Sequence, residues 1–178
     1  MLQRVGKYEI KRLLALAALL GGLSTAAGQA MAAYDANGVA LGASENDIKK
    51  RFPSAHCKPL EWQSRAADRR CDDAKVSFDG IEGRITFYLR KDAVQAFDVR
   101  FETKQLERMM ANLKARYGAP LSEVKDPIGA GDKPVRELYK VLWESGKDRA
   151  VLTAQLDKRL ASLTVSRGNF DEEIYRVR

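Results

Sequence analysis

The sequence predicts an α+β fold in which helices pack on one face of an antiparallel sheet. Three observations lead to this class: two segments with helical spacing of apolar residues, short runs in which apolar and polar residues alternate, and turn sequences between those runs. Helical spacing gathers apolar side chains on one stripe, and alternation gathers them on one side of a strand. Because the connections are short, neighbouring strands have to pair antiparallel.

The first helix is expected to begin at Ser44 and to stop at Pro53. Asp47 follows Ser44 by three residues, which resembles a capping box: the hydroxyl accepts from an orphan backbone N–H and the acid reaches back. Ile48 and Phe52 share one face of this helix because they are four residues apart. Proline then ends the helix, since it cannot continue the hydrogen-bonding pattern.

The second helix is expected after Thr103, whose side chain is a good N-cap. Its apolar stripe consists of Leu106, Met109, Met110, Leu113 and Tyr117. Gly118 and Pro120 end it. The stripe is interpreted as core, with the methionines filling gaps in the packing.

The strands follow from period-two alternation. In segment 85–90 the residues Ile85, Phe87 and Leu89 point one way and Thr86, Tyr88 and Arg90 the other, and segment 97–101 alternates in the same manner after a turn at Lys91-Asp92. These two segments predict a hairpin with one buried and one solvated face. Three more strands are expected over 138–143, 151–156 and 160–165, and segment 124–134 is interpreted as a polar connection.

An internal similarity suggests how these elements are organised. Segment 48–53 resembles segment 113–118, and 75–78 resembles 140–143 at the same offset. We therefore expect two tandem helix-plus-antiparallel-hairpin repeats, at about 38–102 and 103–168, followed by a short C-terminal segment. The alternative is that two amphipathic helices and several strands look alike without forming a repeat.

The N-terminus has the order of features of a cleavable signal peptide. Four basic residues precede the apolar run 13–20, and small residues then lead to Ala30-Met31-Ala32. We expect residues 1–32 to be removed and residues 33–178 to form a single periplasmic domain, although cleavage after Ala30 is an alternative. A membrane anchor is the other alternative, but a spanning helix needs about 20 apolar residues and glycines interrupt this run.

Removal of residues 1–32 lowers the net charge from +7 to +4, because that segment holds four of the 31 basic and one of the 24 acidic residues. A charge of +4 spread along the chain is ordinary for a soluble protein. Together with export, it argues against a nucleic-acid partner. No stable membrane anchor is expected after cleavage, and the oligomeric state stays open.

The two cysteines, Cys57 and Cys71, are expected to form a disulfide, since an even pair in an exported chain is typical of one. A redox pair would favour the Cys-x-x-Cys spacing, and a metal site would need more ligands than two thiols and His56. His56 is the one histidine, and the sequence contains no P-loop, no His-Glu-x-x-His and no Gly-x-Gly-x-x-Gly motif. No catalytic, cofactor-binding or metal-binding residues are therefore expected, although paired carboxylates of a glycan hydrolase could assemble only in the fold.

A loop between the cysteines holds the weak candidates for protein binding: Trp62, Arg65, Arg69 and Arg70. A loop tryptophan among arginines has the composition of an interface anchor. The alternative is that Trp62 folds back as a small satellite core over the disulfide and that the arginines are solvated.

The chain also resembles a known group of exported proteins. Segment 38–45 leads into a short helix ending Arg-Phe-Pro at 51–53, and the second helix ends Arg-Tyr-Gly-Ala-Pro at 116–120. This arrangement resembles the SmpA/OmlA modules (BamE-like lipoproteins) and the related β-lactamase-inhibitor-protein fold, over roughly residues 38–165. The resemblance implies protein binding without catalysis, through the open sheet face or its loops. The chain departs from the lipoproteins because it has no cysteine to carry a lipid near the cleavage site.

The expected function is that of a non-enzymatic periplasmic protein-binding module whose partner is another envelope protein. Two alternatives remain: an inhibitor or immunity protein of a secreted or cell-wall hydrolase, and a carrier or sensor of a small apolar ligand. A stoichiometric complex that blocks an enzyme would indicate the first, and extra mass on the purified protein would indicate the second.

Overall fold

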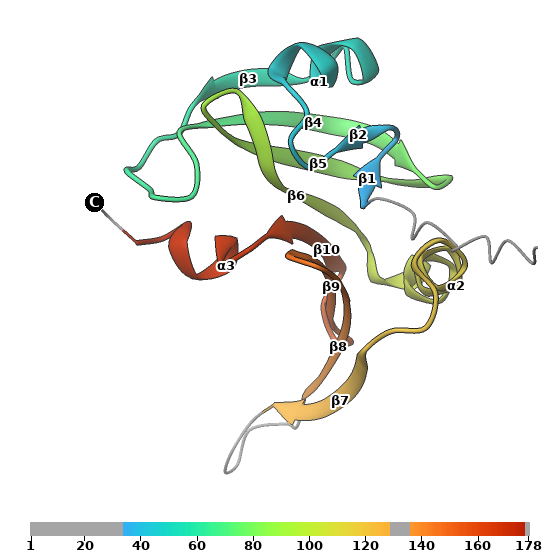
Figure 1. The fold of residues 1–178 in the computed structure, drawn as a ribbon. Helices are drawn as coiled ribbons and strands as arrows, with labels where there is room; N and C mark the ends of the chain where they lie inside the picture. Colours follow the sequence, from blue (N-terminus) through green and yellow to red (C-terminus); the bar gives the residue numbers. More distant parts are fainter. Residues whose placement is uncertain (1–33, 129–135, 177–178) are drawn as a thin grey trace, which may run out of the picture. The chain divides into compact units, whose positions relative to one another are not determined.

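The computed structural model describes residues 34–128 and 136–176; the segment 1–32, where the signal peptide is predicted, lies outside them. Eight strands form one antiparallel sheet in the described part of the chain. They are β3 (His56–Pro59), β4 (Arg69–Phe78), β5 (Ile81–Arg90), β6 (Ala93–Glu102), β7 (Ser122–Ile128), β8 (Arg136–Ser145), β9 (Asp148–Gln155) and β10 (Leu160–Arg167). Their order in the sheet is β3-β4-β5-β6-β10-β9-β8-β7 (Figure 1).

The expected fold class is wrong: the structure is 51% strand and 19% helix, and it does not consist of two tandem helix-plus-hairpin repeats. Strand β6 pairs with β10, so strands from both parts of the chain belong to one continuous sheet. The helices are short: α1 (Glu45–Arg51), α2 (Leu106–Tyr117) and α3 (Phe170–Glu173). A small hairpin, β1 (Asp35–Ala36) and β2 (Val39–Ala40), precedes α1.

Strand β7 explains part of this error, because segment 124–134 was expected to be a connection. Six residues of β7, from Ser122 to Pro127, are exposed. The strand lies at one edge of the sheet, where Lys125 and Pro127 are typical of edges that resist further pairing. A strand that is polar on both sides has no alternation, so its sequence does not distinguish it from a loop.

Helix α1 confirms the capping box. The Asp47 backbone N–H donates to Ser44 Oγ at 3.2 Å, and the Ser44 backbone N–H donates to Asp47 Oδ2 at 3.1 Å. The helix ends at Arg51, with Phe52 as its C-cap directly before Pro53. Ile48 and Phe52 are both buried in the core, as their shared face predicted.

Helix α2 carries the expected apolar stripe but not the expected cap. A single 3-10 turn (Thr103–Gln105) precedes the helix, and the Thr103 hydroxyl donates to the backbone carbonyl of Lys158 at 2.7 Å. Thr103 is therefore not the N-cap of α2; it connects the helix entry to the turn between β9 and β10. The buried residues of α2 are Met109, Met110, Leu113 and Tyr117.

The alternating segments form strands where they were expected. In the β5–β6 hairpin, Ile85 lies opposite Val99 and Phe87 opposite Phe97. Lys91 and Asp92 connect the strands with positive φ angles of 49° and 59°, the left-handed conformation that suits a two-residue hairpin turn. Strands β8 and β10 cover the segments expected at 138–143 and 160–165, and β9 covers the segment expected at 151–156 except for its last residue.

The main core lies on one face of the sheet, between the strands and the two longer helices. Phe87 is fully buried there, with its ring centroid 5.1 Å from that of Phe52 and 5.9 Å from that of Phe97. Ile48 from α1 and Leu113 from α2 belong to the same cluster. We call this side of the sheet the core face.

A second, smaller cluster lies on the opposite face, where α3 covers one end of the sheet (Figure 1). Phe170 and Ile174 of the C-terminal segment pack there against Tyr88 of β5 and Ala96 of β6. The chain between β3 and β4 closes the cluster with Leu60, Trp62, Ala66 and Ala67. Its members come from three distant parts of the sequence.

Candidate functional site

The side of the sheet opposite the core face is the candidate site, and we call it the open face. Strand register defines two rows of side chains across it. The first row runs through Asp72, Thr86, Asp98, Thr164, Val151, Leu142 and Ser122, and the second through Arg84, Arg100, Ser162, Thr153, Lys140 and Val124. The second cluster covers the neighbouring part of this face, beside Tyr88 and Ala96.

Acids and hydroxyls alternate along the first row on the β4 to β10 side. The Thr86 hydroxyl donates to Asp72 Oδ1 at 2.8 Å, and the Thr164 hydroxyl donates to Asp98 Oδ2 at 3.0 Å. Asp98 Oδ1 accepts a hydrogen bond from Arg100 Nε–H at 3.0 Å. Both carboxylates are thus hydrogen-bonded on the surface of the sheet, which fixes their orientation.

The β9 and β8 side of the open face is less polar. Val151, Leu142 and Leu138 are half-buried, and Val124 on β7 is 39% exposed. Hydroxyl side chains such as Thr153 lie between them. A face that mixes aliphatic and hydroxyl groups in this way has the composition of a surface that excludes water against a partner.

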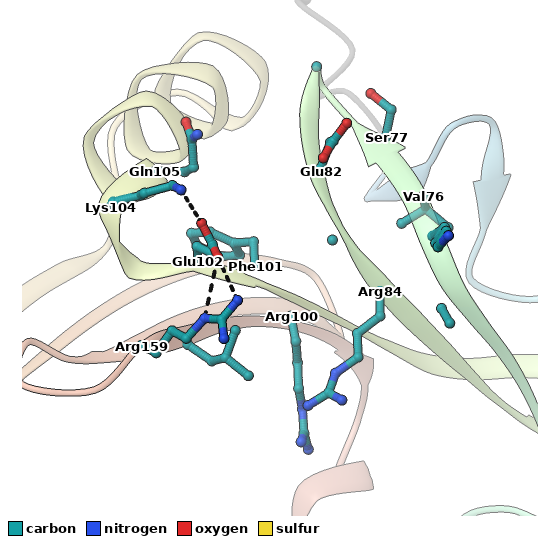
Figure 2. A pocket seen from close by; sticks show the side chains of 15 residues that line it. Val76, Ser77, Glu82, Arg84, Arg100, Phe101, Glu102, Lys104, Gln105 and Arg159 are labelled. Atoms are coloured by element: carbon teal, nitrogen blue, oxygen red, sulfur yellow. Dashed lines mark hydrogen bonds and ion pairs between the residues drawn. The ribbon is translucent and has the colours of Figure 1, made fainter.

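A hollow of about 1180 Å³ opens at the end of β5 and β6 on this face. Its lining includes five basic side chains (Lys75, Arg84, Arg100, Lys104 and Arg159) and two acidic ones (Glu82 and Glu102). Figure 2 shows Glu102 bound to Lys104 and to Arg159, whose Nη2 lies 3.0 Å from Glu102 Oε1. One of the two acids is therefore already neutralised, and the hollow is electropositive.

The sequence candidates lie at the edge of the second cluster. The Trp62 indole N–H donates to the backbone carbonyl of Ile174 at 3.0 Å, and its ring stacks on Tyr175 at a centroid distance of 6.1 Å. The Ser64 hydroxyl donates to the backbone carbonyl of Glu173 at 3.1 Å. These contacts place Trp62 in a satellite core, but beside the C-terminal segment rather than over the disulfide.

The three arginines of that loop do not form one group. Arg69 Nε lies 2.9 Å from Glu45 Oε2, and Arg70 Nε lies 3.0 Å from Asp72 Oδ2. Arg65 is exposed and lines a separate hollow of about 460 Å³ beside Phe170. Their role in protein binding stays a prediction, and the arrangement gives them different surroundings rather than a common site.

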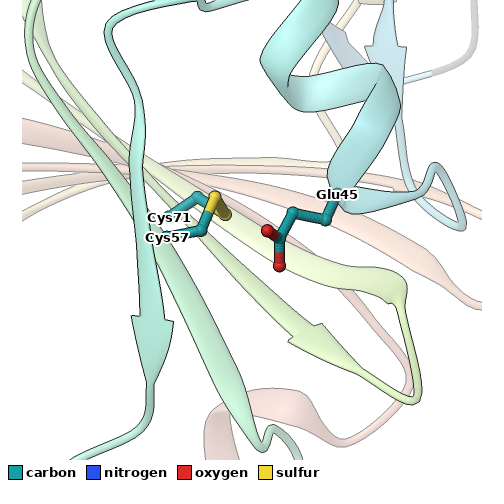
Figure 3. Close-up of side chains that lie close together, drawn as sticks. All are labelled: Glu45, Cys57 and Cys71. Atoms are coloured by element: carbon teal, nitrogen blue, oxygen red, sulfur yellow. A yellow bond between two sulfur atoms is a disulfide. The ribbon is translucent and has the colours of Figure 1, made fainter.

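Cys57 and Cys71 form a disulfide between directly opposed residues of β3 and β4, with a Cα–Cα distance of 3.9 Å. Figure 3 shows the Glu45 carboxylate beside this bridge, and its oxygen and the two sulfurs lie within 4.8 Å of one another. The group cannot hold a metal while the bridge is closed, because metal binding requires thiolates. The salt bridges to Lys49 and Arg69 lower the pKa of Glu45, so the carboxylate is charged near neutral pH.

Two tyrosines with raised pKa values lie on the core face. Burial raises the pKa of Tyr117, whose ring packs against Tyr34 and Trp143. Burial, together with a hydrogen bond to Glu123, raises the pKa of Tyr139 to about 12. Both groups are neutral near pH 7, and their positions in the packed core give them a structural role.

His56 lies exposed on the edge strand β3, opposite Asp72. No serine, threonine or cysteine of the described residues is hydrogen-bonded to it. The arrangement expected for a nucleophile and base is therefore not assembled around this histidine in the described part of the chain.

Sequence reasoning missed the pairing of Arg84 with Arg100. The alternation of segments 85–90 and 97–101 already assigned one side of the hairpin to polar residues. The signal that could have found the pair is the extension of that alternation back to Arg84, combined with the two-residue turn that sets the register.

Comparison with protein-family models, with curated proteins and with solved structures finds no match. The resemblance to the SmpA/OmlA and β-lactamase-inhibitor-protein group therefore stays a prediction. Within residues 34–128 and 136–176, none of the helices has the length and apolar character needed to cross a membrane.

Proposed function

We propose that this chain is an exported, non-enzymatic module that binds another envelope protein on the open face of its sheet. The observation that carries the proposal is the extent of that face: two rows of side chains cross six or more strands, and none of the helices in residues 34–128 and 136–176 lies over them. A broad face with aliphatic, hydroxyl and charged groups suits a protein surface, whereas small molecules favour enclosed, mostly apolar cavities.

Two features support export. The Cys57–Cys71 disulfide is of the kind that persists in oxidising compartments such as the periplasm. Tyr34, two residues after the predicted cleavage site, is buried with its ring 4.7 Å from that of Tyr117. Cleavage after Ala32 leaves this buried tyrosine on the mature chain, so processing there is compatible with the fold.

The test is crosslinking in living cells from a photoreactive residue placed at Thr153, on the open face. A matched copy carries the same residue at Glu107, which is exposed on α2. The expected result is one dominant adduct from position 153 and none from position 107, together with an intact mass that begins at Ala33. Equal adducts from both positions, or none from either, would overturn the binding proposal; retention of residues 1–32 would overturn export.

The identity of the adduct separates the module from an inhibitor. If the captured protein is a hydrolase that loses activity in a one-to-one complex, the chain is an inhibitor or immunity protein. A carrier of apolar ligands receives less support, because the hollow at the end of β5 and β6 is lined largely by charged side chains.

A further inference from the structure

Arg84 and Arg100 are directly opposed on neighbouring strands of the open face. Figure 2 shows both side chains extending to the same side, away from Glu82. Like charges at directly opposed positions destabilise a sheet. The pair therefore costs stability, and a function is needed to explain why it is there.

The donors of this pair are only partly used. Arg100 is 54% exposed in its side chain and spends its Nε on Asp98. Arg84 makes no hydrogen bond or ion pair with any residue that the structure describes. The Nη groups of Arg100 and the whole guanidinium of Arg84 are thus available to an incoming acceptor.

The strand next to the pair, β4, is interrupted by a bulge opposite Arg84. A bulge in β4 separates the pair Asp73–Ile85 from the pair Val76–Gly83, so Arg84 has no partner of its own on β4. Asp73, which is 5% exposed, holds the bulge: Oδ1 accepts from the Lys75 backbone N–H at 3.1 Å, and Oδ2 accepts from the Ser54 hydroxyl at 2.6 Å. Such bulges recur beside functional sites.

Next to the arginine pair, Gly83 allows β5 to approach β6 closely. A Cβ added there would stand 2.5 Å from the backbone oxygen of Arg100, which no side chain could tolerate without a backbone shift. Backbone contact at Gly83 thus sets how closely β5 and β6 approach beside the two arginines, and the bulge lies on the other side of Arg84. The nearby acids Asp98 and Glu102 are already bonded to basic side chains.

We propose that Arg84 and Arg100 form a carboxylate-binding site, which receives an aspartate or glutamate side chain from the partner protein that occupies the open face. Guanidinium groups bind carboxylates through two parallel hydrogen bonds, so a pair of them favours an acidic segment. This inference rests on the proposed function, because it names the chemistry of the partner at one end of the same face.

The direct test uses a blocked peptide with two adjacent glutamates and the matched glutamine peptide as control. In the full mature protein, the arginine Nε–Hε NMR signals of Arg84 and Arg100 are expected to shift with the glutamate peptide only. The double variant R84Q/R100Q is expected to weaken binding at least tenfold, while R51Q, at an exposed position on α1, leaves it unchanged. Unshifted signals, or unchanged binding by R84Q/R100Q, would overturn the proposal.

Two further measurements test whether the ligand is a lipid and whether the variant is unfolded. If phosphatidylglycerol vesicles displace the peptide, or bind when the peptide does not, the ligand of the pair is a lipid phosphate and not a protein carboxylate. That result would overturn the proposal. The urea midpoint of R84Q is expected to equal or exceed that of the parent, because one like charge is removed, so lost binding cannot be ascribed to unfolding.

Crosslinking from position 153 separates the two proposals. If R84Q/R100Q abolishes a face-specific adduct, both stand. If the adduct forms undiminished, the module function stands and the carboxylate site fails. If the glutamate peptide binds the arginine pair but no face-specific adduct forms, the proposed function fails and the site is an anion site without this partner.

Discussion

Thr86 and Phe87 are neighbours in β5 and face opposite sides of the sheet, and they summarise how the two faces differ. Phe87 is fully buried between the rings of Phe52 and Phe97, under α1. Thr86 is half-buried and hydrogen-bonded to Asp72, on a face that none of the described helices covers at this point. The core face is held by apolar contact, and the open face is organised by hydrogen bonds and charge.

The open face is not simply a solvated surface. A sheet face that only needs solubility would alternate opposite charges across its strands, since such pairs stabilise it. Here Arg84 opposes Arg100, and the aliphatic residues Val151 and Leu142 are opposed within the adjoining row. The residues of the core face are therefore those that folding stability requires, whereas the open face carries features that stability alone does not require.

The largest expected effect comes from Phe87, with its neighbour Thr86 as the matched comparison. Phe87→Ala is expected to lower the free energy of unfolding by about 3–5 kcal/mol, because it leaves a cavity in a closed core. Thr86→Ala is expected to cost only about 1 kcal/mol, the worth of one partly exposed hydrogen bond. Urea denaturation measures both, and equal losses would break the distinction between the faces.

Removal of the disulfide should have the next largest effect. The double variant C57S/C71S is expected to lose about 3 kcal/mol of stability, because the bridge constrains the unfolded chain over a 14-residue separation. Urea denaturation with and without a reducing agent checks this, since reductant should destabilise the parent but not the variant. Labelling of both cysteines by a thiol reagent in the folded, unreduced protein would contradict the bridge.

Trp62→Ala tests whether the covered end of the open face is a true core. A loss of about 2 kcal/mol is expected, since the substitution removes a half-buried ring and its hydrogen bond to Ile174. Arg65→Ala, an exposed neighbour, should stay within about 0.5 kcal/mol of the parent. If Trp62→Ala leaves stability unchanged but abolishes the adduct from position 153, Trp62 belongs to the binding surface instead.

The sequence predicted the elements whose signals are local. The capping box at Ser44 and Asp47, the two-residue turn at Lys91 and Asp92, and the Cys57–Cys71 bridge all depend on residues close together in the chain. The fold class failed because it depends on pairings between distant strands, above all β6 with β10. Alternation indicates which side of a strand is buried, but it does not indicate which distant strand lies beside it.

The arginine pair and the surroundings of Trp62 could not be predicted from the sequence for a related reason. Arg84 meets Arg100 only because of the strand register, which the bulge after Asp73 and a second irregularity after Tyr88 interrupt. Trp62 looked like an exposed anchor, since the residue that covers it, Ile174, lies 112 positions away in the chain. Local composition indicated which residues were unusual but not what they touch.

The prediction that tests the edge of the core face concerns Tyr139 on β8, and its effect at neutral pH is small. Its folded pKa of about 12 lies above the ordinary value of 10.0, mainly through burial and then through the hydrogen bond to Glu123 of the edge strand β7. The folded protein therefore keeps the phenol proton over a range in which the unfolded chain loses it. This contribution is complete below pH 10 and disappears as the pH rises toward 12.

Tyr139→Phe should cost about 1 kcal/mol near pH 7 but should flatten the fall in urea midpoint between pH 10 and 12. A variant whose midpoint falls as steeply as that of the parent would show that Tyr139 does not hold this edge, and that the core face ends before β7.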